Sequence, residues 1–212
     1  MYMCAQCGVR ACKKGEKEHW PKTCPMHEQE LMQRAYVEYE KPENHSFYVT
    51  SSELEALGYG VWPRVRETME LCRRMNYTKL GLAFCAGLHS EAKTLDTILR
   101  KNGFEVVSVM CKTGGIPKQK VGIPEEHTLH PERFEAMCNP IAQAMLLEKQ
   151  QTQFNIVLGL CVGHDSLFYK YSHTLTTTVV VKDRVLAHNP VGALYCASGY
   201  LSNKIHLPEK SE

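Results

Sequence analysis

Apolar residues in the middle of the chain fall into short runs that predict buried strands. The four runs are Leu80–Phe84, Val106–Met110, Ile156–Leu160 and Thr176–Val181. Each run is bounded by turn or helix signals, and the last is dense in β-branched residues. Near-continuous apolar runs of this length are typical of parallel strands that are covered on both faces. We therefore expect a sheet of four or more strands.

Helical patterns lie before and between these runs. A first expected helix runs from a capping box at Ser52 and Glu55 to Gly58, and a second begins at Pro63 and includes Val65, Met69 and Cys72. A third includes Leu95, Ile98 and Leu99 and ends at Gly103. A fourth begins at the cap Asn139 and Pro140 and reaches Leu147, and a fifth begins at Asn189-Pro190. Strands that alternate with helices pair in parallel, with helices on both faces of the sheet. The pattern predicts an α/β fold: a three-layer domain with a mostly parallel sheet.

The first 45 residues follow a different pattern. They are rich in Cys, Lys, Glu and His, and they contain no long apolar run. Such a segment cannot bury a core of its own, so something else must order it. We expect a cysteine-rich metal-binding segment over residues 1–45 and the α/β domain over residues 46–212.

Composition and charge exclude some classes of partner. The chain has 212 residues, 43% hydrophobic, and a formal net charge of +2, which gives no reason to expect nucleic acid or an anionic membrane. No apolar run approaches the roughly 18 residues of a membrane span. Cys4 and Cys7 stand where a signal peptide would need an apolar core. A cytoplasmic location is expected.

Ten cysteines in a reducing compartment are not a disulfide framework, so they serve as metal ligands, reactive thiols or core residues. Cys4, Cys7, Cys12 and Cys24 stand close together in the segment without a core. Thiolates bind soft or borderline cations tightly, and the Cys-x-x-Cys spacing lets two sulfurs meet one ion. We expect these four residues to form an N-terminal Cys4 metal knot.

The identity of this metal stays open between two alternatives. Four thiolates suit a structural, tetrahedral zinc ion, which is the first expectation. Close cysteines followed by a distant Cys24-Pro25 also resemble iron–sulfur ligation, although the intervals differ from the standard ferredoxin runs. A [4Fe-4S] cluster is therefore the alternative.

A second set of cysteines follows the predicted strands. Cys85, Cys111 and Cys161 each come directly after one of the first three runs. The carboxyl ends of parallel strands form the crevice where ligands bind in open α/β sheets. Three thiols distant in sequence are therefore expected to meet at one edge, unless each is a small core residue.

Other groups are expected at the same edge. Cys138 and His188 each stand directly before an Asn-Pro helix start, where a helix N-terminus favours a thiolate or an anion. The sequence Cys161-Val-Gly-His164-Asp165 places a thiol, an imidazole and a carboxylate in one turn. We take Cys161 and His164 as candidate catalytic residues, and Cys85, Cys111, Cys138, Cys161 and His188 as candidate cofactor-binding residues.

Three interpretations of this edge remain open. A Cys161 or Cys138 thiolate paired with His164 would be an activated nucleophile. The thiols and His164 could instead hold an open metal or iron–sulfur site, which would be a second centre. In the third interpretation the thiols are core residues. The stretch Lys112-Thr-Gly-Gly-Ile-Pro-Lys118 adds two amines, which could hold a small anion or belong to a solvated loop.

The motifs together resemble a known family. They are Cys4-x-x-Cys7 with Cys12 and Cys24-Pro25, Phe84-Cys85-Ala-Gly-Leu, Cys111-Lys112, Cys138-Asn139-Pro140, Gly159-Leu-Cys161-Val-Gly-His164-Asp165, Lys182-Asp-Arg184 and His188-Asn189-Pro190. The combination resembles, over nearly the whole chain, a prokaryotic family of uncharacterised, cysteine-rich proteins described as predicted metal-binding proteins with a domain of unknown function. The resemblance implies metal binding and carries over no reaction, substrate or catalytic residue.

The leading expectation is a cytoplasmic metal-binding protein with a structural Cys4 site and a second, cysteine-lined metal or iron–sulfur pocket at the strand ends. Redox or sulfur chemistry on a small substrate would fit this pocket. The alternative is a non-catalytic, metal-stabilised binding module whose sheet cysteines are core. The sequence leaves open whether the chain is an enzyme, and which small-molecule substrate or protein partner it binds.

Overall fold

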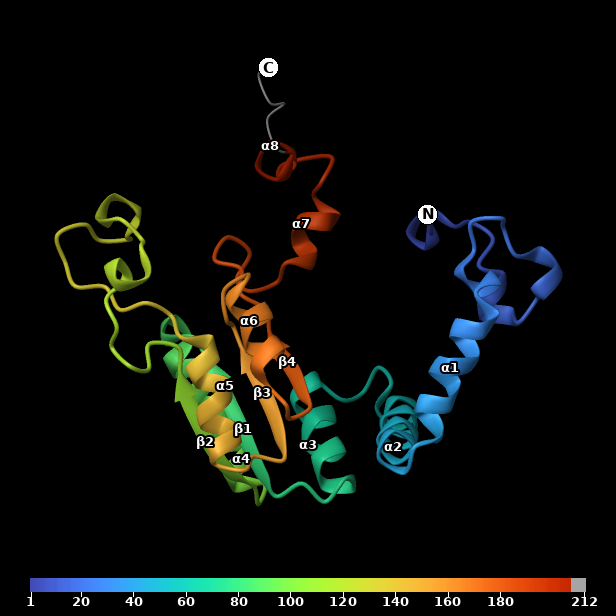
Figure 1. The fold of residues 1–212 in the computed structure, drawn as a ribbon, viewed down its shortest axis with the longest axis horizontal. Helices are drawn as coiled ribbons and strands as arrows, with labels where there is room; N and C mark the ends of the chain where they lie inside the picture. Colours follow the sequence, from blue (N-terminus) through green and yellow to red (C-terminus); the bar gives the residue numbers. More distant parts are fainter. Residues whose placement is uncertain (207–212) are drawn as a thin grey trace. The chain divides into compact units, whose positions relative to one another are not determined.

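The computed structural model describes residues 1–206 and divides the chain into two compact units, Met1–Tyr59 and the part from Gly60 onward. The first unit begins with four 3-10 turns and continues with two helices (Figure 1). These elements are η1 (Cys4–Gln6), η2 (Ala11–Lys14), η3 (Lys17–His19), η4 (Pro25–His27), α1 (Gln29–Glu40) and α2 (Pro42–Gly58). The units divide after α2, rather than between residues 45 and 46 as the sequence suggests.

Helix α2 explains this difference. It begins at Pro42, whose missing N–H is harmless in the first helical position. Ser52 and Glu55 lie inside the helix, so the predicted capping box is wrong, while Gly58 is confirmed as the helix end. Within the first unit only Ala11, Leu54 and Gly58 are buried, so this unit has almost no apolar core.

The second unit is the predicted three-layer α/β domain. Its strands are β1 (Lys79–Phe84), β2 (Glu105–Met110), β3 (Phe154–Leu158) and β4 (Thr176–Val180). They form one parallel sheet in the order β2-β1-β3-β4. The four predicted strands are confirmed, with β3 beginning and ending two residues earlier than expected.

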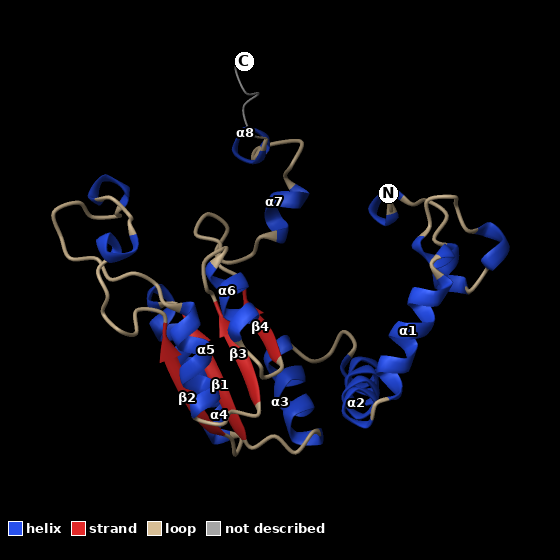
Figure 2. Ribbon diagram, in the orientation of Figure 1, coloured by secondary structure: helices blue, strands red, loops and turns tan. Residues whose placement is uncertain are grey.

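Helices cover both faces of this sheet. The helices that flank the sheet are α3 (Arg64–Arg74), α4 (His89–Lys101), α5 (Pro140–Lys149) and α6 (His164–Tyr171). Two short helices, α7 (Val191–Tyr195) and α8 (Ser202–Ile205), follow β4 and lie beyond the end of the sheet (Figure 1). Both α4 and α5 pack against β1 and β2, and Figure 2 shows α5 in front of the sheet and α4 behind it. The starts of α3 and α5 were predicted from Pro63 and from Asn139-Pro140, and the Asn139 side chain caps α5 as expected.

The strand order places a topological switch point between β1 and β3. The chain leaves β1 for β2 on one side and later enters β3 on the other, so the loops after β1 and β3 diverge there. Gly159, just after β3, has φ +64°, and a Cβ at this position would come within 2.0 Å of Leu88 Cδ1. The loops after β1 and β3 therefore pack against each other where they leave the sheet, before they diverge.

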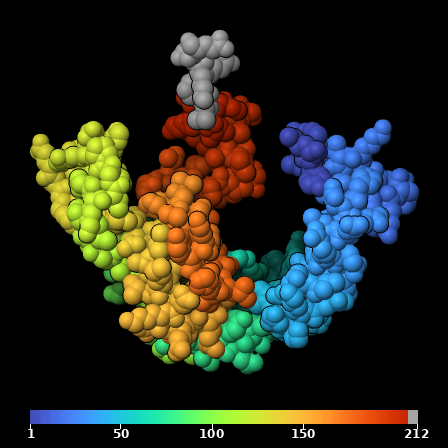
Figure 3. Space-filling model, viewed as in Figure 1, coloured from blue at the N-terminus to red at the C-terminus, as the bar shows by residue number. Residues whose placement is uncertain are grey.

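Two long segments continue from this same end of the sheet. Residues 111–139 leave β2 and return to α5, and residues 181–190 leave β4 (Figure 1). In the space-filling view a hollow separates the yellow-green loop from the orange and red segment that follows β4 (Figure 3). Among residues 1–206, no helix combines the length and apolarity that a membrane crossing needs.

Candidate functional site

The sheet itself fixes two of the candidate cysteines. The Cys85 N–H donates to Leu158 O on β3 (3.1 Å), and the Cys111 N–H donates to Phe84 O on β1 (2.9 Å). These bonds continue the parallel ladder by one residue beyond β1 and β2. Both side chains therefore leave from rigid backbone, and they are almost fully buried, with 8% and 2% exposed.

Helix α5 brings the third cysteine to the same place. The N–H of Asn139 donates to Cys111 O (2.7 Å), which docks the start of α5 on the end of β2. The buried Gln143, one turn further along, donates through Nε2 to Phe84 O (3.2 Å) and Val109 O (2.7 Å). Cys138, which precedes Asn139, is thereby held beside Cys111.

The three thiols interact with one another. Cys111 lies between the other two, and hydrogen bonding to it lowers the pKa of both Cys85 and Cys138, against the opposing effect of burial. The Gly87 N–H and Lys182 act in the same direction on Cys85, as Lys112 and His164 do on Cys138. The pKa of Cys111 is raised by its two sulfur neighbours and by burial.

These pKa directions describe a mixed protonation state. Cys111 holds one proton, so it can donate to one neighbouring sulfur at a time, and the three groups titrate as a unit. Its own sulfur accepts the N–H of Ala86 (3.3 Å), so the loops after β1 and β2 interlock at this point. Of the three groups, Cys85 and Cys138 therefore have the greater thiolate character and Cys111 has the least.

Cys161 approaches from the loop after β3. The guanidinium of Arg184, from the segment after β4, donates to Cys161 Sγ (3.1 Å). The Cys161 carbonyl accepts the N–H groups of His164 and Asp165 at the start of α6. Helix α6 was not predicted, and it sets the positive end of a helix next to this thiol.

The four cysteines and Arg184 line one cavity of about 950 Å³. The predicted residues that it brings together are Cys85, Cys111, Cys138, Cys161, His164 and His188. Cys85, Cys111 and Cys161, which follow three different strands, thus line a common cavity. Asp165 is not among the described lining residues, and its carboxylate accepts the N–H of Ser166 instead.

His188 is held in a specific tautomer. Its φ of +63° turns the chain back, and its Nδ1 accepts the N–H of Asp183 (3.1 Å). A neutral ring whose Nδ1 accepts carries its proton on Nε2. In this arrangement His188 offers a donor rather than a metal-ligating nitrogen. The five-residue α7 that follows begins at Val191, with Pro190 in the cap position.

Cationic side chains in this cavity were missed as site residues by the sequence analysis. Lys182 and Arg184 line it, together with Lys112 of the predicted anion-binding stretch. Lys182 and Arg184 could have been predicted, because both follow the fourth predicted strand and residues that follow parallel strands meet at the ligand-binding edge of the sheet. Gln143, a polar residue on the apolar face of α5, had no such signal.

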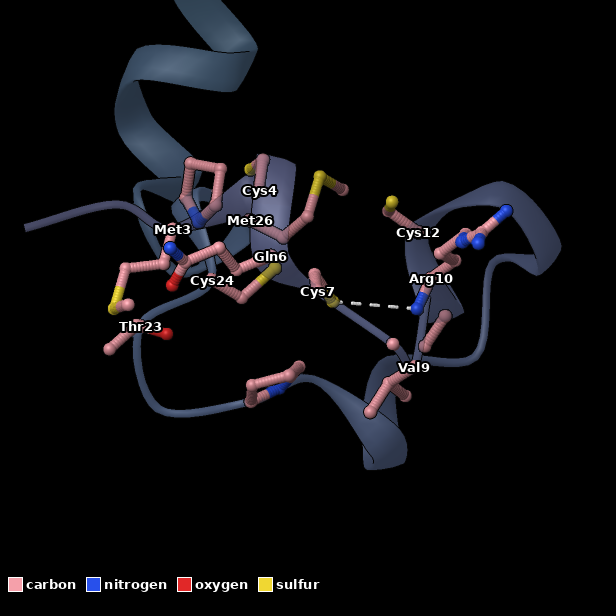
Figure 4. A pocket seen from close by; sticks show the side chains of 14 residues that line it. Met3, Cys4, Gln6, Cys7, Val9, Arg10, Cys12, Thr23, Cys24 and Met26 are labelled. Carbon is pink, nitrogen blue, oxygen red and sulfur yellow. Dashed lines mark hydrogen bonds between the residues drawn. The ribbon is translucent and has the colours of Figure 1, made fainter. Parts of the chain in front are cut away.

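The N-terminal cysteines line a separate pocket within the first unit. Cys4, Cys7, Cys12 and Cys24 all border this pocket of about 420 Å³, as Figure 4 shows. Cys4 and Cys12 stand on the turns η1 and η2, and Cys24 directly precedes η4. The sulfur of Cys7 accepts the N–H of Arg10 (3.5 Å). Sequence-distant thiols of this segment thus share one small space.

Neither group of cysteines forms a finished metal cage. Within residues 1–206, no group of three or more His, Cys, Asp or Glu side chains has the arrangement needed to hold an ion. The donor sets nevertheless fit soft or borderline metals, because each pocket offers four thiols. Binding would require the side chains to turn toward a common centre.

Comparison with known proteins places the chain among proteins without an assigned activity. Residues 24–179 match the family described as "Protein of unknown function (DUF1847)". This range includes all four cysteines of the larger cavity. The chain is also 44% identical over 192 residues to "Uncharacterized protein MJ0455" of Methanocaldococcus jannaschii, covering 91% of this chain and 93% of that protein. No solved structure matches.

Proposed function

The chain belongs to the DUF1847 family, and from that premise we propose that it binds metal at two cysteine-lined centres. The first is a structural zinc, or alternatively a [4Fe-4S] cluster, at Cys4, Cys7, Cys12 and Cys24. The second is a metal ion or iron–sulfur cluster at Cys85, Cys111, Cys138 and Cys161, where redox or sulfur chemistry acts on a small molecule.

One observation carries the second centre: sulfurs from three separate backbone segments contact one another, and a fourth lines the same cavity. Cysteines whose pKa values are lowered, as at Cys85 and Cys138, are suited to coordinate a cation because the thiolate is the more accessible form. Thiolates are also the form in which cysteine binds metal. The site lies at the carboxyl end of the sheet, next to the switch point.

The first centre would supply order to a part of the chain that has almost no core. Residues 1–28 form only short 3-10 turns, and Ala11 is their one buried residue. A segment with so little core needs another source of order, and metal coordination can supply it. The four thiols around one pocket are the groups available for this.

Within the larger cavity the chain's own residues have distinct tasks. A bound metal or cluster would supply electron transfer or Lewis acidity. Arg184 holds the Cys161 sulfur in place by its hydrogen bond. His164, at the start of α6 on the cavity wall, is the group placed to accept or deliver a proton. Cys161 and His164 are therefore our candidates for direct participation in the reaction.

The alternative function is a non-catalytic, metal-stabilised binding module. One observation favours it: Cys85 and Cys111 belong to the same buried cluster as Ala83, Leu147 and Phe168. Cysteines in such a cluster commonly serve as small core residues. On this view a metal occupies only the N-terminal pocket.

Metal analysis separates the two functions. The protein is purified without oxygen, and its metal and acid-labile sulfide are quantified per chain. Two centres are expected. Cys138→Ser and Cys161→Ser should each remove most of the second centre and spare the first, and Cys7→Ser should do the reverse. Cys196→Ser, an exposed cysteine outside both pockets, is the matched control and should remove neither. A single centre that survives Cys138→Ser and Cys161→Ser would leave the binding module as the better account.

A further inference from the structure

Cationic side chains cluster in the larger cavity, two of them on the segment after β4, across from the loop between β2 and α5 (Figure 1). Lys112 follows β2, and Lys182 and Arg184 follow β4, so three positive side chains from two strand ends meet the cysteines. None of the three lies within ion-pair distance of a carboxylate in the described part of the chain. Glu135 lines the cavity but is paired with Lys118 (2.7 Å).

The cysteines alone do not account for this charge. Lys112 Nζ donates to Ala136 O, which is a neutral group and leaves the ammonium charge without a counterion among residues 1–206. Arg184 donates one N–H to Cys161, and a guanidinium has five to offer. Lys182 lies beside Cys85, close to the switch point. Positive charge therefore remains for an additional anionic group in the cavity.

The opposite wall is apolar and open. Val121, Ile123 and Leu129, from the loop between β2 and α5, line the cavity together with Ile141 and Leu167. Val121 is 53% exposed and Leu129 75% exposed. An apolar ligand that covers water-exposed apolar side chains at a cavity removes apolar surface from water, which favours binding. A wholly polar ligand would leave this wall uncovered.

We propose that the substrate of this site is a small organic anion, whose acidic group binds to Lys182 and Arg184 and whose apolar body lies against Val121 and Leu129. The proposal rests on the proposed function in one respect, because it takes the cysteine cluster as the reacting centre. The His188 ring offers a further donor to the acidic group through Nε2. The cavity volume of about 950 Å³ is sufficient for a ligand of this size beside a metal centre.

Three probes test the two walls separately. Hexanoate, hexylamine and inorganic phosphate are titrated into the full-length, anaerobically purified protein by calorimetry at low salt. Hexanoate should bind, hexylamine should not, and phosphate should bind more weakly than hexanoate because it cannot cover the apolar wall. Equal binding of hexylamine, or phosphate binding at least as tight as hexanoate, would overturn the proposal.

Variants then assign the contacts. Arg184→Gln and Lys182→Gln should each weaken hexanoate about tenfold, the typical effect of losing one charge-assisted hydrogen bond. Leu129→Ser should weaken hexanoate and leave phosphate unchanged. Lys93→Gln, on the exposed side of α4, is the matched control and should change nothing. Unaltered hexanoate affinity in both cation variants, with an intact fold by circular dichroism, would contradict the assignment.

Metal content measured on the same samples keeps this proposal separate from the proposed function. Hexanoate binding in protein that lacks a second centre would support the anion site and refute the second centre. A second centre in protein that binds none of the probes would support the second centre and refute the anion site.

Discussion

Cys138 and Cys72 lie in the same domain, yet their surroundings give the two thiols opposite chemistry. Burial on α3 raises the pKa of Cys72 to about 12. For Cys138, a hydrogen bond from Cys111 lowers the pKa, and the nearby Lys112 and His164 reinforce the effect. A thiolate reacts with alkylating agents and a thiol does not, so these environments can be distinguished by reactivity.

We therefore predict a difference in alkylation by iodoacetamide of the reduced, metal-free protein. Because its pKa is lowered, Cys138 stays largely thiolate as the pH falls from 8.5 to 7, and its rate should change less than about threefold. Free cysteine, with a pKa of about 8.5, should slow by roughly tenfold or more over the same range. Cys72 should stay unmodified throughout. The measurement is peptide mass spectrometry over time, and a Cys138 rate that falls in parallel with free cysteine would contradict the prediction.

At the scale of single elements, Gln143 is the residue that joins three cysteine-bearing segments. Its amide, on α5 behind Cys138, donates to Phe84 O before Cys85 and to Val109 O near Cys111. The amide oxygen has no hydrogen-bond partner in the described structure. A buried polar residue with an unsatisfied atom is unfavourable by itself. Gln143 therefore stabilises the fold through its two hydrogen bonds to the strand ends.

Gln143→Leu should lower the free energy of unfolding by about 1–3 kcal/mol, because a buried carbonyl group and a partly buried one lose this donor. It should also lower the occupancy of the second centre, since the segments that carry its ligands are no longer tied together. Gln150→Leu, an exposed residue at the end of α5, is the control and should change stability by no more than about 0.5 kcal/mol. Urea unfolding measures the stability of both variants, and equal stability of the two would exclude this role for Gln143.

The elements also mark how far the sequence determines the site. Strands β1 to β4 were predictable because each is a run of apolar residues covered on both faces. Helices α1 and α6 were missed for physical reasons: α1 buries none of its residues, and α6 buries only Phe168, so neither has a strong apolar period. The convergence of Cys85, Cys111 and Cys161 follows from parallel topology alone. The contact of Cys138 with Cys111 depends on the docking of α5, which no local pattern specifies.

At the scale of the whole molecule, the two units differ in what holds them together. The unit from Gly60 onward has a continuous core that includes Leu80, Leu82 and Ile156, all 0% exposed. The unit Met1–Tyr59 has almost none, and we propose that a metal at its four cysteines orders it. Loss of that metal should therefore affect one unit and spare the other.

Cys7→Ser should make residues 1–28 readily cleaved by trypsin while the main thermal unfolding transition stays within about 2 °C of the wild type. The reason is that the α/β core loses no contact within its own unit. Limited proteolysis with mass spectrometry and calorimetry check the two parts of this prediction. Resistance of residues 1–28 to trypsin in Cys7→Ser would contradict the structural role of the first centre, and Cys196→Ser serves as the control for a cysteine outside both pockets.

The central claim is that the cavity of Cys85, Cys111, Cys138 and Cys161 binds metal through sulfur, and X-ray absorption at the metal edge tests it most directly. The sample is a full-length variant with Cys4→Ser, Cys7→Ser, Cys12→Ser and Cys24→Ser, so that only the second centre contributes. The account predicts a shell of sulfur scatterers at about 2.3 Å, which disappears when Cys111→Ser is added. A variant that binds no metal, or a shell made only of oxygen and nitrogen, would contradict it.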